Sequence, residues 1–315
     1  MRVGVVFPGQ GSQAVGMGGA IAEQSARAAE LFERAERVLG YDLLALVREG
    51  PEERLRETRY SQPAIYVVNY ALAAAAGDAL RPVVSAGHSF GEFCSLTLAE
   101  ALGFEEALAL VEQRGLAMQE AAERAPGAMA AILGLDVAAI REAVAEGRAF
   151  GRVNLANFNA PAQIVISGDR DAVARAGELA LAKGAKRVVP LNVSGAWHSE
   201  LMAPARERFA PYVERAQVAE PRFVVVSNVD AQPYRDLAAI KENLIRSVTD
   251  EVLWHATAER FLAERPELIV EFGGSPVLAP LFKRMPGAPK TLHVGDEGGV
   301  AKLRELLSGA AVGKG

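Results

Sequence analysis

The chain has 315 residues, of which 50% are hydrophobic and 23% are charged, and its formal net charge is −5. This length can bury one large core or two unequal ones, and the composition is typical of a soluble globular enzyme. The negative charge provides no general attraction to nucleic acid or to an anionic membrane, so we expect neither as a partner. The single cysteine, Cys94, excludes an internal disulfide and a cysteine-rich metal site.

No segment is typical of export or of membrane insertion. The apolar stretch Val3–Phe7 stops early, at Pro8-Gly9, which does not fit a secretory signal. The longest apolar segment, Ala64–Ala76, is too short to span a bilayer. We therefore expect a cytoplasmic protein.

Strands and helices alternate in the first part of the chain, which favours a parallel sheet covered by helices. A glycine-rich loop, PGQGSQAVGMGG, follows the first strand. The expected elements are a strand at Arg2–Phe7, helices at Ile21–Leu39, Leu43–Arg48 and Ala64–Leu80, a strand at Pro82–Ala86, and helices at Glu92–Ala101 and Glu105–Ala122.

The middle of the chain has a different order, β-α-β-β-α-β, which is the ferredoxin-like pattern. The elements are strand Ala128–Leu133, helix Val137–Glu146, strands Val153–Ala156 and Gln163–Ser167, helix Asp171–Lys183 and strand Arg187–Leu191. We expect this segment, residues 126–193, to be a small domain inserted into a large one.

The larger pattern resumes afterwards, so residues 1–125 and 194–315 form the expected large α/β domain. Its later elements are helix Glu200–Val213, strand Phe223–Ser227, helices from Leu237 to Leu262, strand Leu268–Phe272, a helix near Pro276–Arg284, strand Thr291–Val294 and a last helix, with a frayed tail at Gly309–Gly315. A cleft between two such domains is a common place for a substrate.

The strongest local motif is Gly87-x-Ser89-x-Gly91 between a strand and a helix, the nucleophile-elbow arrangement. The turn is so sharp that neighbouring side chains would collide, and it points the serine hydroxyl into a cleft. The same turn directs the amide of Phe90 towards developing negative charge. The expected fold is therefore α/β, with an α/β-hydrolase-like core around a parallel sheet and the small inserted ferredoxin-like domain. A plain tight turn is the alternative.

A serine of this kind needs a base, and only four histidines are available. His88 should project elsewhere from the turn. His255 falls in an expected helix, and His293 falls in a late strand. His198 follows a strand and the flexible Ser194-Gly195, at the sheet edge where the elbow opens, so it is the expected base.

Two further features have competing interpretations. The loop Gly9-Gln10-Gly11 satisfies a loose dinucleotide-binding pattern, but its glycines delay the next helix, so a second oxyanion donor is the preferred interpretation. Arg114 lies in an expected helix, where a surface arginine paired with Glu112 or Glu120 is the plain alternative. No group of residues has metal-ligand spacing and no cofactor motif occurs, so we expect neither a metal nor a cofactor.

The chain resembles the malonyl-CoA:acyl carrier protein transacylase family over nearly its whole length. The strings that carry the resemblance are, in order, FPGQGSQ, AGHSFGEF, RGLAMQ, GAMAAILGLD, NFNAPAQIVISG and SGAWHS. The resemblance implies transfer of a malonyl group from malonyl-CoA to acyl carrier protein through a malonyl-serine, in fatty-acid or polyketide synthesis, by a protein that we expect to be a monomer.

Individual roles follow from the matched positions. The resemblance implies that Ser89 carries the acyl ester and His198 is the base. The amides of Gln10 and Phe90 would form the oxyanion hole. Arg114 would bind the malonyl carboxylate, to which its planar fork is suited, and Asn159 is a further substrate-binding candidate.

Three positions depart from the family pattern. Ser247 stands where a glutamine usually orients the histidine, so its backbone carbonyl is the expected acceptor unless the base is less well oriented. Trp197 replaces a phenylalanine and is expected to narrow the pocket, and GGSP replaces a more usual GPG.

The rival functions are a serine esterase or thioesterase and a non-catalytic carrier-binding subunit. Lys186-Arg187 and Lys283-Arg284 are candidate docking sites for an acidic carrier protein.

Overall fold

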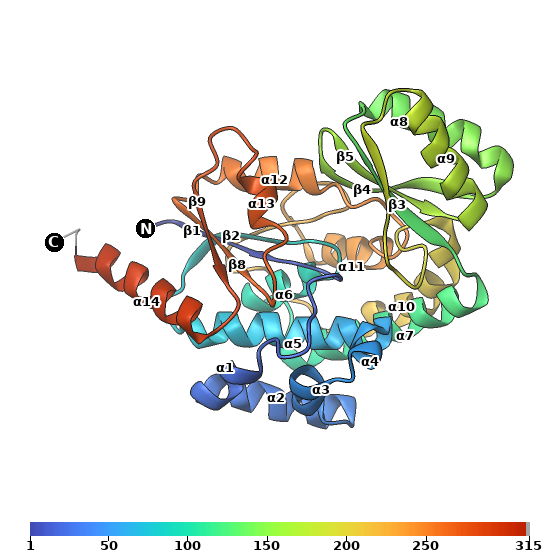
Figure 1. Cartoon of the computed structure of the whole chain (residues 1–315). Coiled ribbons are helices and arrows are strands. Elements are labelled where there is room, and N and C mark those ends of the chain that lie inside the picture. Colours follow the sequence, from blue (N-terminus) through green and yellow to red (C-terminus); the bar gives the residue numbers. More distant parts are fainter. Residues whose placement is uncertain (313–315) are drawn as a thin grey trace.

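The computed structural model describes residues 1–312, and its larger part is built on a five-stranded parallel sheet in the order β7-β2-β1-β8-β9 (Figure 1). Every neighbouring pair in this sheet is parallel. The strands are β1 (Val3–Phe7), β2 (Pro82–Gly87), β7 (Val224–Val226), β8 (Leu268–Phe272) and β9 (Lys290–Val294). This parallel pairing agrees with the expected α/β core.

The two faces of the parallel sheet are covered by different helices. Val5 and Phe7 of β1 point into one apolar core, with α5 and α6, whereas Val6 between them points into a second core, with α12 and α13. Figure 1 shows these two pairs of helices on opposite sides of the sheet. Because both faces are covered, every residue of β1 and β8 is buried, which explains their continuous apolar runs.

The helices of this larger part have the following bounds. They are α1 (Gly19–Gln24), α2 (Ala26–Leu39), α3 (Leu43–Glu49), α4 (Glu52–Arg56), α5 (Thr58–Ala76), α6 (Gly91–Leu98), α7 (Phe104–Arg124), the 3-10 turn η2 (Glu200–Met202), α10 (Ala203–Arg215), α11 (Leu237–Arg246), α12 (Trp254–Ala263), α13 (Ala279–Phe282) and α14 (Glu297–Val312). Among the described residues, none of these helices combines the length and apolar character needed to cross a bilayer.

A separate four-stranded antiparallel sheet, in the order β4-β5-β3-β6, forms the smaller part. Its elements are β3 (Ala128–Leu133), α8 (Val137–Gly147), the 3-10 turn η1 (Arg148–Phe150), β4 (Val153–Ala160), β5 (Gln163–Gly168), α9 (Arg170–Ala182) and β6 (Arg187–Pro190). The first strand lies between the third and the fourth, which confirms the ferredoxin-like arrangement.

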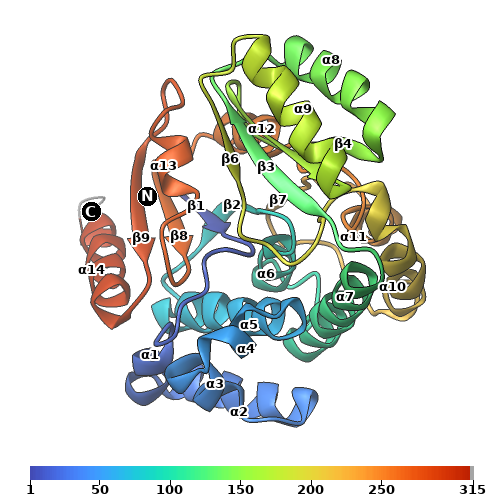
Figure 2. The same cartoon turned by 45° about the vertical axis from the view of Figure 1, so that its right-hand side comes forward.

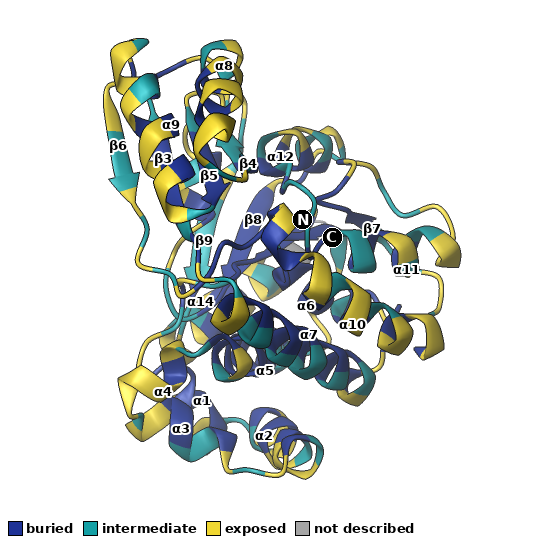
Figure 3. Cartoon of the chain, turned by 90° about the vertical axis from the view of Figure 1, so that its right-hand side faces the viewer, coloured by how far each residue is buried: buried dark blue, intermediate teal, exposed yellow. Residues whose placement is uncertain are grey.

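The small sheet also has two different faces. Ile132 and Ile166 pack with α8 and α9 in a core of their own, whereas Met129 and Val165 belong to the main core and face the larger sheet. Figure 2 shows α8 and α9 on the outer side of the small sheet, and in Figure 3 their outer surfaces are exposed. The face of the small sheet that carries Met129 and Val165 is not covered by α8 and α9, and these two residues line a cavity.

Several expected boundaries are wrong for local reasons. The helix expected at Ile21–Leu39 divides at Ser25, whose hydroxyl caps α2 by accepting from the amide of Ala28. The helix expected at Ala64–Leu80 runs over Thr58–Ala76, because Pro63 is tolerated near its start and Gly77, with a φ of 81°, ends it. The helix α4 was not expected, and strand β4 continues past Ala156 to Ala160.

The C-terminal end of the described chain is helical where fraying was expected. Helix α14 continues to Val312, so the expectation for Gly309–Gly315 is wrong as far as that residue. Residues 313–315 lie outside the described part of the structure.

The contact of Gly91 with β1 generates a prediction about folding. A Cβ atom added at Gly91 would lie 2.4 Å from the carbonyl oxygen of Phe7, whereas one added at Gly309 meets nothing within 4 Å. We expect Gly91→Ala to lower the free energy of unfolding by about 2 kcal/mol or more, because backbone must move to make room. Gly309→Ala is the control and should change it by less than about 1 kcal/mol. Equal effects in urea titrations would contradict this account of the elbow.

Candidate active site

Ser89 lies on a sharp turn between β2 and α6, with a φ of 53°. A Cβ atom at Gly87 would lie 1.9 Å from the carbonyl carbon of Gly91, so no larger residue fits at either of these two positions. A non-glycine residue in this left-handed conformation costs about 1–3 kcal/mol and persists only where its surroundings enforce it. The structure therefore contains the expected elbow, with the serine side chain directed into a cavity.

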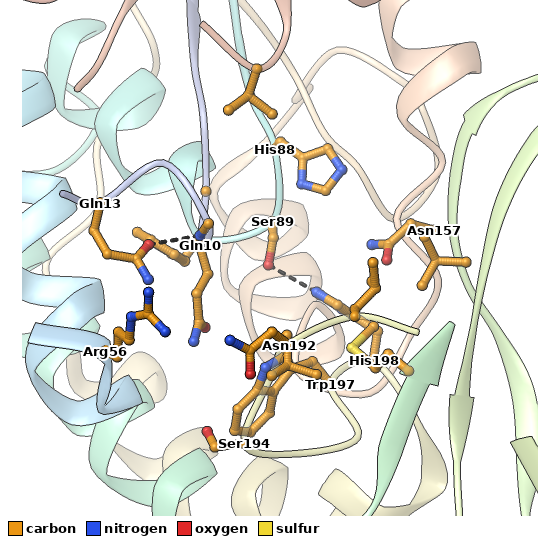
Figure 4. Close-up of a pocket in the computed structure, with 18 of the residues that line it drawn as sticks. Gln10, Gln13, Arg56, His88, Ser89, Asn157, Asn192, Ser194, Trp197 and His198 are labelled. Atoms are coloured by element: carbon orange, nitrogen blue, oxygen red, sulfur yellow. Dashed lines mark hydrogen bonds between the residues drawn. The ribbon is translucent and has the colours of Figure 1, made fainter. Parts of the chain in front are cut away.

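His198 lies on the loop between β6 and η2 and meets Ser89. Its Nε2 is 2.9 Å from the Oγ of Ser89, a contact drawn as a dashed line in Figure 4. The other ring nitrogen, Nδ1, is 3.1 Å from the backbone carbonyl oxygen of Asp250. A carbonyl only accepts, so Nδ1 carries the proton and Nε2 is left to accept from the serine hydroxyl.

The backbone of His198 is also held in place. It has a φ of 55°, and its carbonyl oxygen accepts a hydrogen bond of 2.8 Å from the side-chain amide of Asn154 on β4. A residue of the small sheet thus fixes the loop that carries the candidate base. Neither Asp250 nor Asn154 was expected from the sequence, because a backbone carbonyl and a distant amide leave no local motif.

The expectation for Ser247 needs an amendment. Among the described residues, Nδ1 of His198 meets the backbone carbonyl oxygen of Asp250, and no hydrogen bond joins the imidazole to the backbone carbonyl of Ser247. The Ser247 carbonyl oxygen accepts from the guanidinium of Arg114 at 3.4 Å. The side-chain hydroxyl of Ser247 turns away and donates to the carbonyl oxygen of Leu244. The imidazole of His198 is therefore oriented by the backbone carbonyl of Asp250 and not, as expected, by that of Ser247.

Arg114 is buried, with 1% of its surface exposed, and lies beside the candidate nucleophile. One terminal nitrogen donates to Gln62 at 2.8 Å, and the other is 3.4 Å from the Oγ of Ser89. Its Nε has no partner, and among residues 1–312 no carboxylate forms an ion pair with it. The alternative of a surface arginine is wrong, since Glu120 pairs with Arg124 and Arg208 instead.

The two amides expected to stabilise negative charge are both available. Phe90 is the N-cap residue of α6, and Gln10 follows β1; both line the same cavity. Within the described chain, neither amide N–H donates to a protein acceptor. The side-chain amide of Gln10 is occupied by the hydroxyl of Thr58 at 3.1 Å. This arrangement is suited to binding an oxyanion formed beside Ser89.

The remaining histidines have partners other than Ser89, although His88 lies nearer to the site than expected. His88 lines the cavity, but its Nε2 pairs with Oδ1 of Asn159 at 2.9 Å and its ring packs against Trp254. Asn159 also lines the cavity, and its side-chain oxygen Oδ1 is already bonded to His88. His255 lies 3.5 Å from a carboxylate oxygen of Glu259, and the Nε2 of His293 contacts the carbonyl oxygen of Gly273 at 2.8 Å.

The cavity lies between the two sheets and has a volume of about 590 Å³. The carboxyl ends of β1 and β2 supply Gln10 and Ser89, and the free face of the small sheet supplies Met129 and Val165. Trp197 also lines the cavity, and its buried Nε1 has no hydrogen-bond partner in the described part of the chain. In residues 1–312, no cluster of three or more His, Cys, Asp or Glu side chains is arranged to hold a metal ion.

Burial changes the pKa of both titratable groups at the centre of the site, His198 and Arg114. It lowers the pKa of His198 to about 3, with a further lowering by the positive charge of Arg114. It also lowers the pKa of Arg114 to about 10. At neutral pH the imidazole is therefore uncharged and able to accept a proton, while the guanidinium remains protonated.

Comparisons with known proteins agree on one family. The family model described as acyl transferase domain matches residues 5–285. The malonyl CoA-acyl carrier protein transacylase of Haemophilus influenzae is 38% identical over 309 residues, covering 97% of this chain and 99% of that protein.

Two solved structures are similar over the whole chain. An acyl carrier protein S-malonyltransferase from Vibrio cholerae has a TM-score of 0.91 at 40% identity, covering 96% of this chain and 100% of that one. A type II PKS acyl-carrier protein in complex with its malonyl-transacylase gives a TM-score of 0.93 at 38% identity, covering 97% of this chain and 100% of that one.

The low pKa of His198 predicts how the reactivity of Ser89 depends on pH. Reaction with the neutral reagent phenylmethanesulfonyl fluoride requires an uncharged imidazole, which persists until the pH falls through the lowered pKa. We expect a constant labelling rate from about pH 8 to about pH 5 in protein that remains folded by circular dichroism. A rate that halves near pH 6.5, the usual value for histidine, would contradict the prediction.

Proposed function

We propose that this chain, which belongs to the acyl transferase domain family, transfers a malonyl group from malonyl-CoA to the pantetheine thiol of an acyl carrier protein. The observation that carries this proposal is the buried guanidinium of Arg114 beside Ser89 Oγ, which provides for an acyl group with a free carboxylate. The carrier protein would serve fatty-acid or polyketide synthesis. The names of the similar proteins, which are malonyl transferases acting on carrier proteins, support it.

The first half-reaction forms a malonyl ester. The hydroxyl of Ser89 gives its proton to Nε2 of His198 as its oxygen attacks the thioester carbonyl. The amides of Gln10 and Phe90 bind the resulting oxyanion, and loss of one such donor typically costs about 10²–10³ in turnover. When the carbon–sulfur bond breaks, the thiolate of coenzyme A takes the proton back from His198.

The second half-reaction runs the same steps towards a new acceptor. The pantetheine thiol of the carrier protein gives its proton to His198, and its sulfur attacks the ester carbonyl. The bond to Ser89 then breaks, and Oγ regains the proton from the imidazole. One neutral histidine thus serves as base and then as acid in each half-reaction, which requires no second titrating group.

Arg114 supplies the preference for malonyl. Its guanidinium has no carboxylate partner among the described residues and has an unpartnered Nε, so it is a desolvated positive charge that a carboxylate can neutralise. A planar guanidinium can bind a carboxylate through two parallel hydrogen bonds. An acetyl group brings no such charge and leaves the arginine uncompensated.

A hydrolase is the closest rival, and the histidine environment disfavours it. Hydrolases of the α/β type use an acid side chain to orient the histidine. Here the backbone carbonyl of Asp250 holds Nδ1, while the carboxylate of Asp250 contacts Arg246 and Arg206. The carboxylate preference of Arg114 has no purpose in general ester hydrolysis. A non-catalytic carrier-binding role would not require the contact between Ser89 and His198.

The position of one basic pair favours it as a docking site for an acidic carrier protein. Lys283 and Arg284 are exposed just after α13, and Arg284 contacts Gln163, a residue of the cavity wall. None of the four candidate basic residues lines the cavity itself, and among the described residues Lys186 and Arg187 make no side-chain hydrogen bond to a residue that does. We propose the pair Lys283-Arg284, which contacts the cavity wall through Gln163, as the docking site, with the chain acting as a cytoplasmic monomer.

The malonyl-serine intermediate gives a direct prediction. Malonyl-CoA alone should leave a malonyl adduct on Ser89, detected by mass spectrometry of the intact protein and its peptides. Ser89→Ala removes the attacking oxygen and should carry no adduct. Absence of the adduct from the wild-type protein, or an equal adduct on the variant, would refute the proposed intermediate.

Replacing Arg114 tests the origin of the preference for malonyl. We expect Arg114→Ala to lower kcat/KM for malonyl-CoA by about 10²-fold or more relative to acetyl-CoA, because the charged hydrogen bonds to the carboxylate are lost. Arg56→Ala is a matched control, since Arg56 lines the same cavity but already pairs with Glu52. An unchanged malonyl-to-acetyl ratio in Arg114→Ala would remove Arg114 from this role.

A further inference from the structure

The backbone amide of Ser89 is bound from behind the elbow by a side chain that the mechanism above does not use. Asn228, on the loop after β7, accepts this hydrogen bond through Oδ1 at 2.7 Å. Asn228 is buried, with 1% exposed, and its Nδ2 has no partner. The hydrogen bond to Ser89 is thus the single one that the Asn228 side chain makes with the described residues. We infer that the side chain of Asn228 is placed for this contact.

Asn228 is in turn held by a buried carboxylate. Glu92, in the first turn of α6, accepts from the backbone amide of Asn228 through Oε2 at 3.2 Å. Its other oxygen accepts from the hydroxyl of Tyr234. Glu92 is 2% exposed, and burial raises the pKa of its carboxyl group to about 7. A carboxylate is rarely buried this completely without a specific arrangement of donors.

These contacts bear on the strained backbone conformation of the elbow. The strained backbone of Ser89 persists only where its surroundings enforce it. The hydrogen bond from the Ser89 amide to Asn228 occupies that amide, and the next one, on Phe90, is left without a protein acceptor. The contact therefore acts directly on the backbone of the strained residue and, among the described residues, leaves the amide of Phe90 as the neighbouring free donor.

We propose that Asn228 is a positioning residue for the nucleophile and that Glu92 acts on Ser89 through Asn228. Without the Asn228 side chain, the backbone of Ser89 relaxes and its Oγ leaves the position 2.9 Å from His198 Nε2. A displacement of about 1 Å at a reacting atom can lower a rate by roughly 10²-fold. The inference rests on the proposed function only in taking Ser89 as the nucleophile.

The test measures the reactivity of Ser89 with a reagent that makes no use of the malonyl site. In phenylmethanesulfonyl fluoride labelling, Ser89 Oγ displaces fluoride from sulfur while its proton passes to His198, and mass spectrometry follows the adduct. The variants are Asn228→Ala, Asn228→Ser, Glu92→Gln and the double variant Asn228→Ala/Glu92→Gln. Gln232→Ala is the matched control, because Gln232 lies on the same loop with an exposed side chain.

We expect Asn228→Ala and Asn228→Ser to react at least about tenfold more slowly than wild type, and Gln232→Ala to react at the wild-type rate. Glu92→Gln should also be slower. The double variant should be no slower than Asn228→Ala alone, since Glu92 acts through that residue. With malonyl-CoA, kcat should fall while KM stays within about twofold, because no substrate contact is removed.

Three results would overturn the inference. Wild-type labelling rates in folded Asn228 variants would show that the contact is not needed. Additive effects of the two substitutions would show that Glu92 does not act through Asn228. A loss confined to the melting temperature, with unchanged rates, would leave both residues with a role in stability alone. If wild type reacts with the sulfonyl fluoride but not with malonyl-CoA, the proposed function fails while this inference is still tested.

Discussion

The buried positive charge of Arg114 lies 3.4 Å from the hydroxyl oxygen of Ser89 and has no carboxylate partner among the described residues. Taking an unpaired guanidinium out of water is expensive, so the fold stabilises it with neutral acceptors, the amide of Gln62 and the carbonyl of Ser247. The site is thereby prepared for a ligand that brings its own negative charge. The same positive charge helps to keep the neighbouring imidazole neutral.

Two strained residues meet at the centre of this site. Ser89 and His198 both have a positive φ, 53° and 55°, although neither is glycine. Each is held by contacts from distant parts of the chain: Ser89 by Asn228 and the close approach of β1, His198 by Asn154 and Asp250. The small sheet contributes to the geometry of the site through this support, because Asn154 belongs to β4. Strain on both sides of one hydrogen bond makes the geometry specific and costly to disturb.

The features that were predictable from the sequence are those with local causes. The elbow at Ser89 was predictable because glycines are required at Gly87 and Gly91, where added Cβ atoms would meet backbone. His198 could be selected because only four histidines exist: His255 and His293 fall in regular elements, and His88 was expected to project elsewhere from the turn. The succession of strands and helices along the chain followed from the alternation of apolar segments, whereas the order of strands across the larger sheet was not predicted.

The missed features depend on atoms that every residue has, or on contacts between distant segments. The carbonyl oxygen of Asp250 orients the imidazole, and any residue type has such an oxygen. Gln62 and Asn154 reach their partners from other elements, 52 and 44 positions away along the chain. The start of α5 at Thr58 depends on Gln119 of α7, which accepts from the Thr58 amide, so tertiary structure sets that boundary.

The most direct measurement is a crystal structure of the protein after reaction with malonyl-CoA in the absence of carrier protein. The account predicts a malonate ester on Ser89, its carboxylate bound to the guanidinium of Arg114, and its carbonyl oxygen facing the amides of Gln10 and Phe90. An ester whose carboxylate points into solvent, with Arg114 unchanged beneath it, would contradict the central claim that this buried charge selects the acyl group.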